Sequence, residues 1–162
     1  MSEKINSTET IQNPHIYDKV NIGGFIHILE EAVKNKVVQV VYASSSSVYG
    51  LNTPPFKETD LLNTTNSPYA LSKKVMEEYA ALYFRLYNIK TIGLRFFTVY
   101  GPRGRPDMAP YMFVKNIAEG REIFQFGDGT SYRDYTYISD IIDGIIGAIN
   151  NKKNIKCDVY NL

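Results

Sequence analysis

A tyrosine and a lysine four residues apart carry the strongest chemical signal in this sequence. Tyr69 and Lys73 follow Ser67-Pro68, where the serine can cap a helix and the proline suits its first turn. Residues four apart lie on one helix face, so the lysine ammonium would stabilise the phenolate form of the tyrosine. Such a tyrosine can take a proton from a hydroxyl group whose carbon gives up a hydride. For an isolated match, the alternative is a half-buried tyrosine beside a solvated lysine.

A run of serines stands upstream of this pair. The apolar segment 37–43 is typical of a buried parallel strand, and Ser44 to Ser47 follow it directly. Ligands of open α/β sheets bind at the carboxyl ends of the strands, so a hydroxyl from this run can complete a proton relay with Tyr69. A polar turn is the alternative for a serine run alone. The order of strand, serines, capped helix and Tyr-x-x-x-Lys favours one active site.

Alternating helical and extended patterns predict an α/β fold with a partial, Rossmann-like, doubly wound parallel sheet and part of a small substrate-binding region. We expect a polar lead-in over 1–14, the later half of a dinucleotide-binding domain over 15–100, and a substrate-binding region with an interleaved helix and strand over 101–162. The expected helices span 15–36, 69–87, 111–119 and a last segment that ends near 150, capped by Ser139 or Asp140. The expected strands are 37–43, 90–97, 122–126 and 159–162, and 98–110 is expected to be a loop.

The composition excludes several classes of protein. The 162 residues carry a formal net charge of +1, which gives no electrostatic basis for binding nucleic acid. No apolar run reaches membrane-spanning length, and the polar N-terminus does not resemble a secretory signal. The single cysteine, Cys157, cannot form an intrachain disulfide. A cytoplasmic protein without membrane or nucleic-acid partners and without a metal site is therefore expected.

Several motifs in order resemble the extended short-chain dehydrogenase/reductases, in particular their NAD-dependent epimerase/dehydratase family. The matching segments are Val41-Tyr42-Ala43-Ser44-Ser45-Ser46-Ser47-Val48-Tyr49-Gly50, Ser67-Pro68-Tyr69 with Lys73, Leu94-Arg95-Phe96-Phe97-Thr98-Val99-Tyr100-Gly101-Pro102, Gly127-Asp128-Gly129 and Arg133-Asp134-Tyr135-Thr136-Tyr137-Ile138-Ser139-Asp140. The resemblance covers nearly the whole chain from about Asn13 onward.

The resemblance implies NAD as the cofactor and a nucleotide sugar, carried on UDP, as the substrate. It implies that Tyr69 is the catalytic acid/base and that Lys73 is its partner, which also holds the nicotinamide ribose. Ser45 matches the catalytic hydroxyl best when the motif is counted back from Gly50, and Ser46 is the alternative.

Four further residues take roles only through the resemblance. Asn21 and Phe97 match positions near the cofactor, and Phe126 matches a position that packs near the uracil. Arg133 matches an arginine that pairs with the substrate diphosphate. Without the motif, Arg133 would be interpreted as a surface arginine beside Asp134.

The subfamily can be argued from chemistry. Dehydratases and decarboxylases of this family carry an acidic residue directly after the catalytic hydroxyl, whereas serines stand there in this sequence, so an epimerase is favoured. The loop 98–109 is similar to that of UDP-glucuronate 4-epimerases. Oxidation of glucuronate at C4 makes a β-keto acid, and Thr98 and Arg105 are the candidates to grip its carboxylate. A related epimerase of UDP-glucose or UDP-N-acetylglucosamine, with Arg103 and Arg105 merely solvated, is the alternative.

The sequence lacks the Gly-rich turn that holds the cofactor pyrophosphate in this family; Asn21-Ile22-Gly23-Gly24 is not such a turn. The chain therefore resembles a family member truncated at both ends, and a non-catalytic fragment is a further alternative. By resemblance, a complete chain would form a homodimer, and the present one would need a complementing N-terminal piece.

Overall fold

The computed structural model describes residues 11–125, 128–130, 132–151 and 156–162. In chain order the elements are α2 (Pro14–Tyr17), the π-helical segment η1 (Asp18–Gly23), α3 (Gly24–Lys34), β1 (Gln39–Ser45), the 3₁₀ segment η2 (Ser46–Tyr49), α4 (Pro68–Tyr87), β2 (Lys90–Phe96), β3 (Thr98–Tyr100), α5 (Ala109–Ala118), β4 (Tyr135–Tyr137), α6 (Ile138–Ile149) and β5 (Cys157–Asn161).

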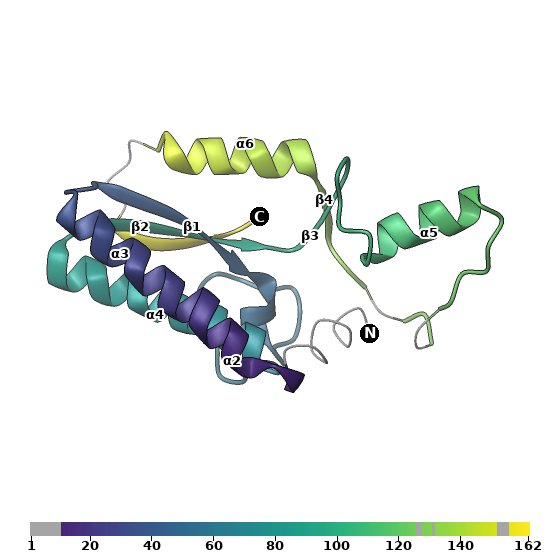
Figure 1. The fold of residues 1–162 in the computed structure, drawn as a ribbon, viewed down its shortest axis with the longest axis horizontal. Coiled ribbons are helices and arrows are strands. Elements are labelled where there is room, and N and C mark those ends of the chain that lie inside the picture. The colour runs from purple at the N-terminus through teal and green to yellow at the C-terminus, as the bar shows by residue number, and fades with distance from the viewer. Residues whose placement is uncertain (1–10, 126–127, 131, 152–155) are drawn as a thin grey trace.

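Three parallel strands form the central sheet in the order β1-β2-β5. Helices α3 and α4 cover one face of this sheet and α6 covers the other (Figure 1). The central strand β2 is buried from Thr91 to Arg95, as expected for a parallel strand covered on both sides. The predicted α/β fold with a doubly wound parallel sheet is therefore confirmed.

Two apolar clusters hold the layers together. Between the sheet and the α3–α4 layer, the buried side chains are Phe25, Leu29, Tyr42, Met76 and Ala80. Between the sheet and α6, they are Ile92, Leu94 and Ala148. Each helix layer therefore has its own core, and the sheet lies between the two.

Local signals fix the ends of α4. Ser67 Oγ accepts a hydrogen bond from the Ala70 N–H at 3.1 Å, and Pro68 is the first helical residue. At the other end, Asn88 takes the left-handed conformation with φ 56° and donates its N–H to the Phe84 carbonyl. Both predicted boundaries are confirmed, and they place Tyr69 in the first turn of the helix.

The predicted helix over 15–36 is present as α2, η1 and α3 in succession, with a π-helical segment in its middle. The predicted strand over 37–43 begins two residues later and runs to Ser45. It continues directly into η2, whose first residue is Ser46.

Three expectations about the second half were wrong. Residues 122–125 form no strand, and the rest of that predicted strand lies outside the described residues. The predicted loop over 98–110 contains β3, which pairs in parallel with the unexpected strand β4. Neither Ser139 nor Asp140 caps α6, because the chain passes from β4 directly into the helix at Ile138.

The predicted division at residues 14 and 100 stays a prediction. Elements from beyond residue 100 take part in the central layers, since β5 pairs with β2 and α6 covers a sheet face. In the described part of the chain, no helix combines the length and the apolar character needed to cross a bilayer.

We expect Asn88→Ala to lower the free energy of unfolding by about 1 kcal/mol, because a Cβ-bearing residue without a local polar group is strained in the left-handed region. Asn88→Gly is the matched control and should leave the stability unchanged or slightly higher. Urea unfolding of the three proteins measures the difference. Equal stability of the alanine and glycine variants would contradict this account of the helix end.

Candidate active site

A cleft opens at the edge of the sheet where β1 and β2 end. Because the two strands are parallel and Ser45 pairs with Phe96, their carboxyl ends meet at the same place. The volume of the cleft is ≈ 1480 Å³, larger than the roughly 300–1,000 Å³ common for a single small ligand. The sequence-predicted residues that line it are Ser45, Ser46, Tyr69, Phe97, Thr98, Arg105 and Arg133.

Tyr69 and Lys73 lie together on the side of α4 that faces β1. Lys73 Nζ is 5.9 Å from the centre of the Tyr69 ring and donates a hydrogen bond to the Ala43 carbonyl at 2.9 Å. Burial lowers the pKa of the Lys73 ammonium. The predicted geometry of one lysine beside one phenol on a single helix face is therefore present.

The serines stand where β1 turns into η2. Ser45 Oγ accepts the Ser47 N–H at 3.2 Å, which caps η2, and it donates to Ser47 Oγ at 3.1 Å. Ser46 is half-buried and is the first residue of η2. Both hydroxyls line the cleft, so both stay candidates for the catalytic hydroxyl.

Asn21 lies in the π-helical segment η1, beside the first turn of α4. Its Nδ2 donates to Ser72 Oγ at 2.9 Å, and Ser72 Oγ donates to the Tyr69 carbonyl at 2.8 Å. The Tyr17 ring meets the Tyr69 ring edge-on at 6.0 Å between centres. π-Helical segments inside α-helices are frequent at functional sites. In this structure, Asn21 acts on the Tyr69 turn through Ser72.

Phe97 and Thr98 occupy the junction between β2 and β3. The Phe97 N–H donates to the Leu162 carbonyl at 3.0 Å, and the Thr98 N–H donates to the Asp134 carbonyl at 3.2 Å. These backbone bonds fix both residues in the wall of the cleft. The β3–β4 pair therefore brings the segments around Thr98 and Asp134 to the same cleft.

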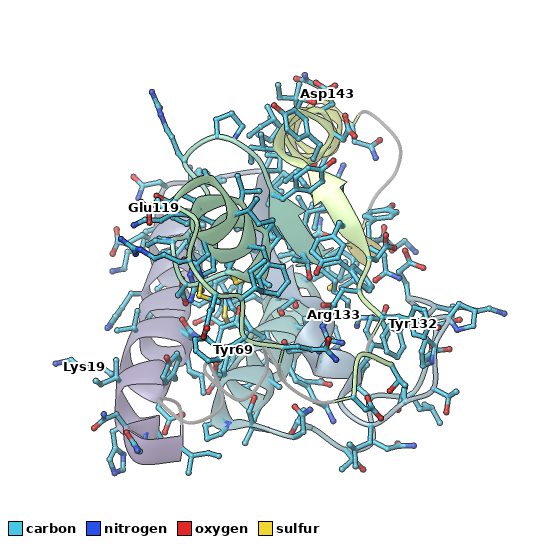
Figure 2. The ribbon with its side chains drawn as sticks, turned by 90° about the vertical axis from the view of Figure 1, so that its right-hand side faces the viewer. Lys19, Tyr69, Glu119, Tyr132, Arg133 and Asp143 are labelled. Carbon is cyan, nitrogen blue, oxygen red and sulfur yellow. The ribbon has the colours of Figure 1, made fainter. Side chains whose placement is uncertain are left out.

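Two predicted arginines line the cleft from different segments. Arg105 Nε donates to Asp107 Oδ1 at 3.0 Å, and this hydrogen bond lowers the pKa of the Asp107 carboxyl. The Arg105 side chain is 59% exposed. Arg133 Nη1 donates to the Tyr132 carbonyl at 3.0 Å. Figure 2, which looks onto this side of the molecule, labels Arg133 and Tyr69.

Phe126, predicted to pack near the uracil, lies outside the described residues. Among the residues that the structure describes, no group of three or more His, Cys, Asp or Glu side chains could hold a metal ion.

The sequence interpretation missed a buried ion pair beneath the cleft, between Glu77 of α4 and Arg95 of β2. Burial acts to lower the pKa of the Arg95 guanidinium, yet the hydrogen bond and the charge of Glu77 outweigh it and raise that pKa. Two signals could have revealed the pair. Arg95 is a charge directly after the apolar stretch 92–94 of its strand, and Glu77 follows Lys73 at helical spacing.

The profile of the NAD dependent epimerase/dehydratase family matches residues 4–162 of this chain. The chain belongs to this family. The order of motifs that suggested the resemblance is thus part of a match over nearly the full sequence.

Sequence relatives within this epimerase/dehydratase family include UDP-glucuronate 4-epimerase 3 of Arabidopsis thaliana. It is 48% identical over 145 residues, which are 86% of this chain and 34% of the plant protein. Protein CapI of Staphylococcus aureus is 47% identical over 137 residues, 84% of this chain and 41% of that protein. The chain spans half or less of the length of the curated relatives it matches.

A solved family member at 40% identity is the UDP-glucuronic acid 4-epimerase of Bacillus cereus, in complex with UDP-glucuronic acid and NAD. It superimposes with a TM-score of 0.83 over 89% of this chain and 46% of that chain. At these values the α/β fold is shared over most of the chain, which confirms the expected Rossmann-like fold.

Proposed function

We propose that this chain carries the acid/base and substrate-binding part of an NAD-dependent UDP-sugar 4-epimerase, and that its sugar is UDP-glucuronate. The observation that carries the proposal is the placement of Tyr69, with Lys73 behind it, in one cleft with the Ser45 and Ser46 hydroxyls. The relatives add support, because UDP-glucuronate 4-epimerases are among them.

The donors beside the cleft fit a nicotinamide nucleotide. An ammonium has three N–H donors, and Lys73 gives one to the Ala43 carbonyl, so the group is anchored and its other donors would serve ribose hydroxyls. Tyr69 and Phe97 line the cleft beside it. These three residues would hold the nicotinamide end, with Asn21 acting through the Tyr69 turn. When bound, NAD⁺ supplies the acceptor for the hydride on C4 and the donor that returns it.

The proton chemistry falls to this chain. Tyr69 takes the proton of the C4 hydroxyl as the C4–hydrogen bond breaks. It returns the proton to the C4 oxygen after the 4-keto sugar has rotated to present its opposite face to the hydride donor. Ser45 or Ser46 hydrogen-bonds the reacting oxygen throughout and keeps it in reach of the phenol. The Lys73 ammonium, 5.9 Å from the centre of the Tyr69 ring, places a positive charge beside the residue that carries the proton.

Recognition of the substrate falls to the arginines and their neighbours. Arg133 pairs with the diphosphate. Arg105 and the Thr98 hydroxyl bind the glucuronate carboxylate. This grip keeps the bond between the sugar ring and the carboxylate carbon out of alignment with the π orbitals of the 4-ketone, so that carbon dioxide is not lost. In the described structure, Arg105 is engaged with Asp107 of the same loop.

The first test is turnover of UDP-glucuronate to UDP-galacturonate with NAD⁺, followed by chromatography. It is made with the chain alone and with the chain grafted in place of the aligned segment of the Bacillus cereus enzyme. In the form that turns over, we expect Tyr69→Phe to lower kcat by about 10²–10⁴-fold, because the general acid/base is lost. Normal turnover by this variant would contradict the mechanism. A folded chain and a folded graft that both lack turnover and NAD binding would favour the non-catalytic fragment.

Arg105→Gln tests the choice of sugar. We expect kcat/KM for UDP-glucuronate to fall by about tenfold or more, since a charge-assisted hydrogen bond is lost, while turnover of UDP-glucose is little changed. Arg103→Gln, in the same loop, is the control and should affect both sugars little. An equal loss on both sugars after Arg105→Gln would favour a neutral-sugar epimerase, an alternative that the exposed Arg105–Asp107 pair also supports.

The partners that we propose are a UDP-sugar, a second copy of the chain and, for full activity, a complementing N-terminal piece with the Gly-rich turn. Support for the second copy comes from exposed apolar side chains on the outer layer of helices, namely Ile16, Val20, Ile28, Leu82 and Leu86. Sedimentation equilibrium should show a dimer whose dissociation is promoted by Leu86→Lys. A monomer at all concentrations would contradict this part.

A further inference from the structure

Glu77 of α4 and Arg95 of β2 form a two-point ion pair beneath the cleft. Arg95 Nη2 lies 2.7 Å from Glu77 Oε2 and Nε lies 3.0 Å from Oε1, with the side chains 4% and 10% exposed. Removing two charges from water carries a large free-energy penalty, and well-packed apolar residues are often at least as stable in such a place. Stability alone therefore gives a weak reason for these charges.

On one side, the pair holds the last residues of β1. Ser44, the residue before Ser45, donates its hydroxyl to Glu77 Oε1 at 2.5 Å. Glu77 lies one turn after Lys73 and two turns after Tyr69, on the same face of α4. A single helix face thus carries the phenol and the carboxylate that anchors the serine strand.

On the other side, the pair holds the end of η2. Arg95 Nη1 donates to the Tyr49 hydroxyl at 2.8 Å, and that hydroxyl donates to Asn161 Oδ1 at 2.7 Å. The Arg95 guanidinium carbon also lies 4.8 Å from the centre of the Tyr49 ring. Since η2 runs from Ser46 to Tyr49, the two candidate hydroxyls lie between two anchored residues, Ser44 and Tyr49.

The same connection continues into the wall of the cleft. Asn161 Nδ2 donates to the Phe56 carbonyl at 3.3 Å, and the Phe56 ring stacks on Tyr49 at 4.6 Å between centres. Phe56 and Phe97 line the cleft, and their ring centres are 6.3 Å apart. One polar network therefore joins α4, the three strands of the central sheet and the aromatic wall.

Resting on the proposed function, we propose that Glu77 and Arg95 are positioning residues, which hold the hydroxyl of Ser45 or Ser46 at a fixed offset from the Tyr69 phenol. Neither side chain is among the described residues that line the cleft, so they act through Ser44 and Tyr49. Proton transfer requires its groups within hydrogen-bond reach. A displacement of about 1 Å can lower the rate about 10²-fold, so the pair acts on kcat more than on binding.

The test compares four variants: Glu77→Gln, Arg95→Met, the double variant and the control Glu78→Gln, whose side chain is an exposed neighbour. They are made in whichever protein turns over the substrate, the chain alone or the chain grafted into the Bacillus cereus enzyme. We expect each single variant to lower kcat by about 10–10²-fold while KM changes by less than about threefold. The double variant leaves no unpaired charge and should regain the melting temperature of the starting protein, but not its kcat. Glu78→Gln should match the starting protein in all three quantities.

Recovery of both stability and kcat in the double variant would show that the pair is only structural and would overturn the inference, as would normal kcat in Glu77→Gln. Hydrogen exchange of amides 44–50 gives a readout that needs no turnover. Faster exchange of these amides in Glu77→Gln, but not in Glu78→Gln, supports the inference even when the starting protein is inactive. Inactivity of the starting protein on every UDP-sugar would overturn the proposed function alone. Unchanged exchange in Glu77→Gln overturns the positioning role.

Discussion

The parallel pairing of β1 with β2 is the constraint on which the site depends. Its register sets Ser44 beside Arg95 and Ser45 beside Phe96, so both strands end together and the segments that follow them leave the sheet at the same edge. A parallel pair also requires a crossover, and α4 supplies it with Tyr69 at its start. The helix therefore begins beside the strand ends, and its first turns face the serines. A shift of this register would separate the hydroxyls from the phenol without changing any residue of the site.

Prediction from the sequence succeeded where the signals were local. The serine cap and the left-handed asparagine set the two ends of α4 through hydrogen bonds to residues three or four positions away. The spacing of Tyr69 and Lys73 needs only a helix to bring the two side chains together. It failed where two distant segments define an element. The pairing of β3 with β4 joins residues near 98 to residues near 135, and neither three-residue strand has a detectable periodicity. The apolar residues Ile123 and Phe124 resemble a strand in sequence, but they pair with no strand among the residues that the structure describes.

The same distinction applies to the site. Seven of the residues that line the cleft were predicted from motif order and spacing, namely Ser45, Ser46, Tyr69, Phe97, Thr98, Arg105 and Arg133. The Glu77–Arg95 pair was not, since it joins a helix to a strand across the sheet face and depends on which way each element turns. Likewise, Asp107 stands two residues after Arg105, but only the fold of that loop determines that the two side chains meet. Partners of charged groups are set by tertiary structure, whereas the identity of the groups can be predicted.

The π-helical segment η1 has a consequence for how one helix serves two surroundings. Each added residue turns the helix by about 100°, so a wider turn shifts every later side chain to another direction. Before the segment, Tyr17 meets the ring of Tyr69 at the cleft; after it, Phe25 packs on Tyr42 in the core, 4.8 Å between ring centres. The π-helical turn lies between these two contacts, so the angle between them differs from the one that a regular helix would give. The π-helical segment thus changes the direction of the side chains along one continuous helix. The helix presents the Asn21 amide to the first turns of α4 and the apolar side chains of Phe25 and Leu29 to the sheet.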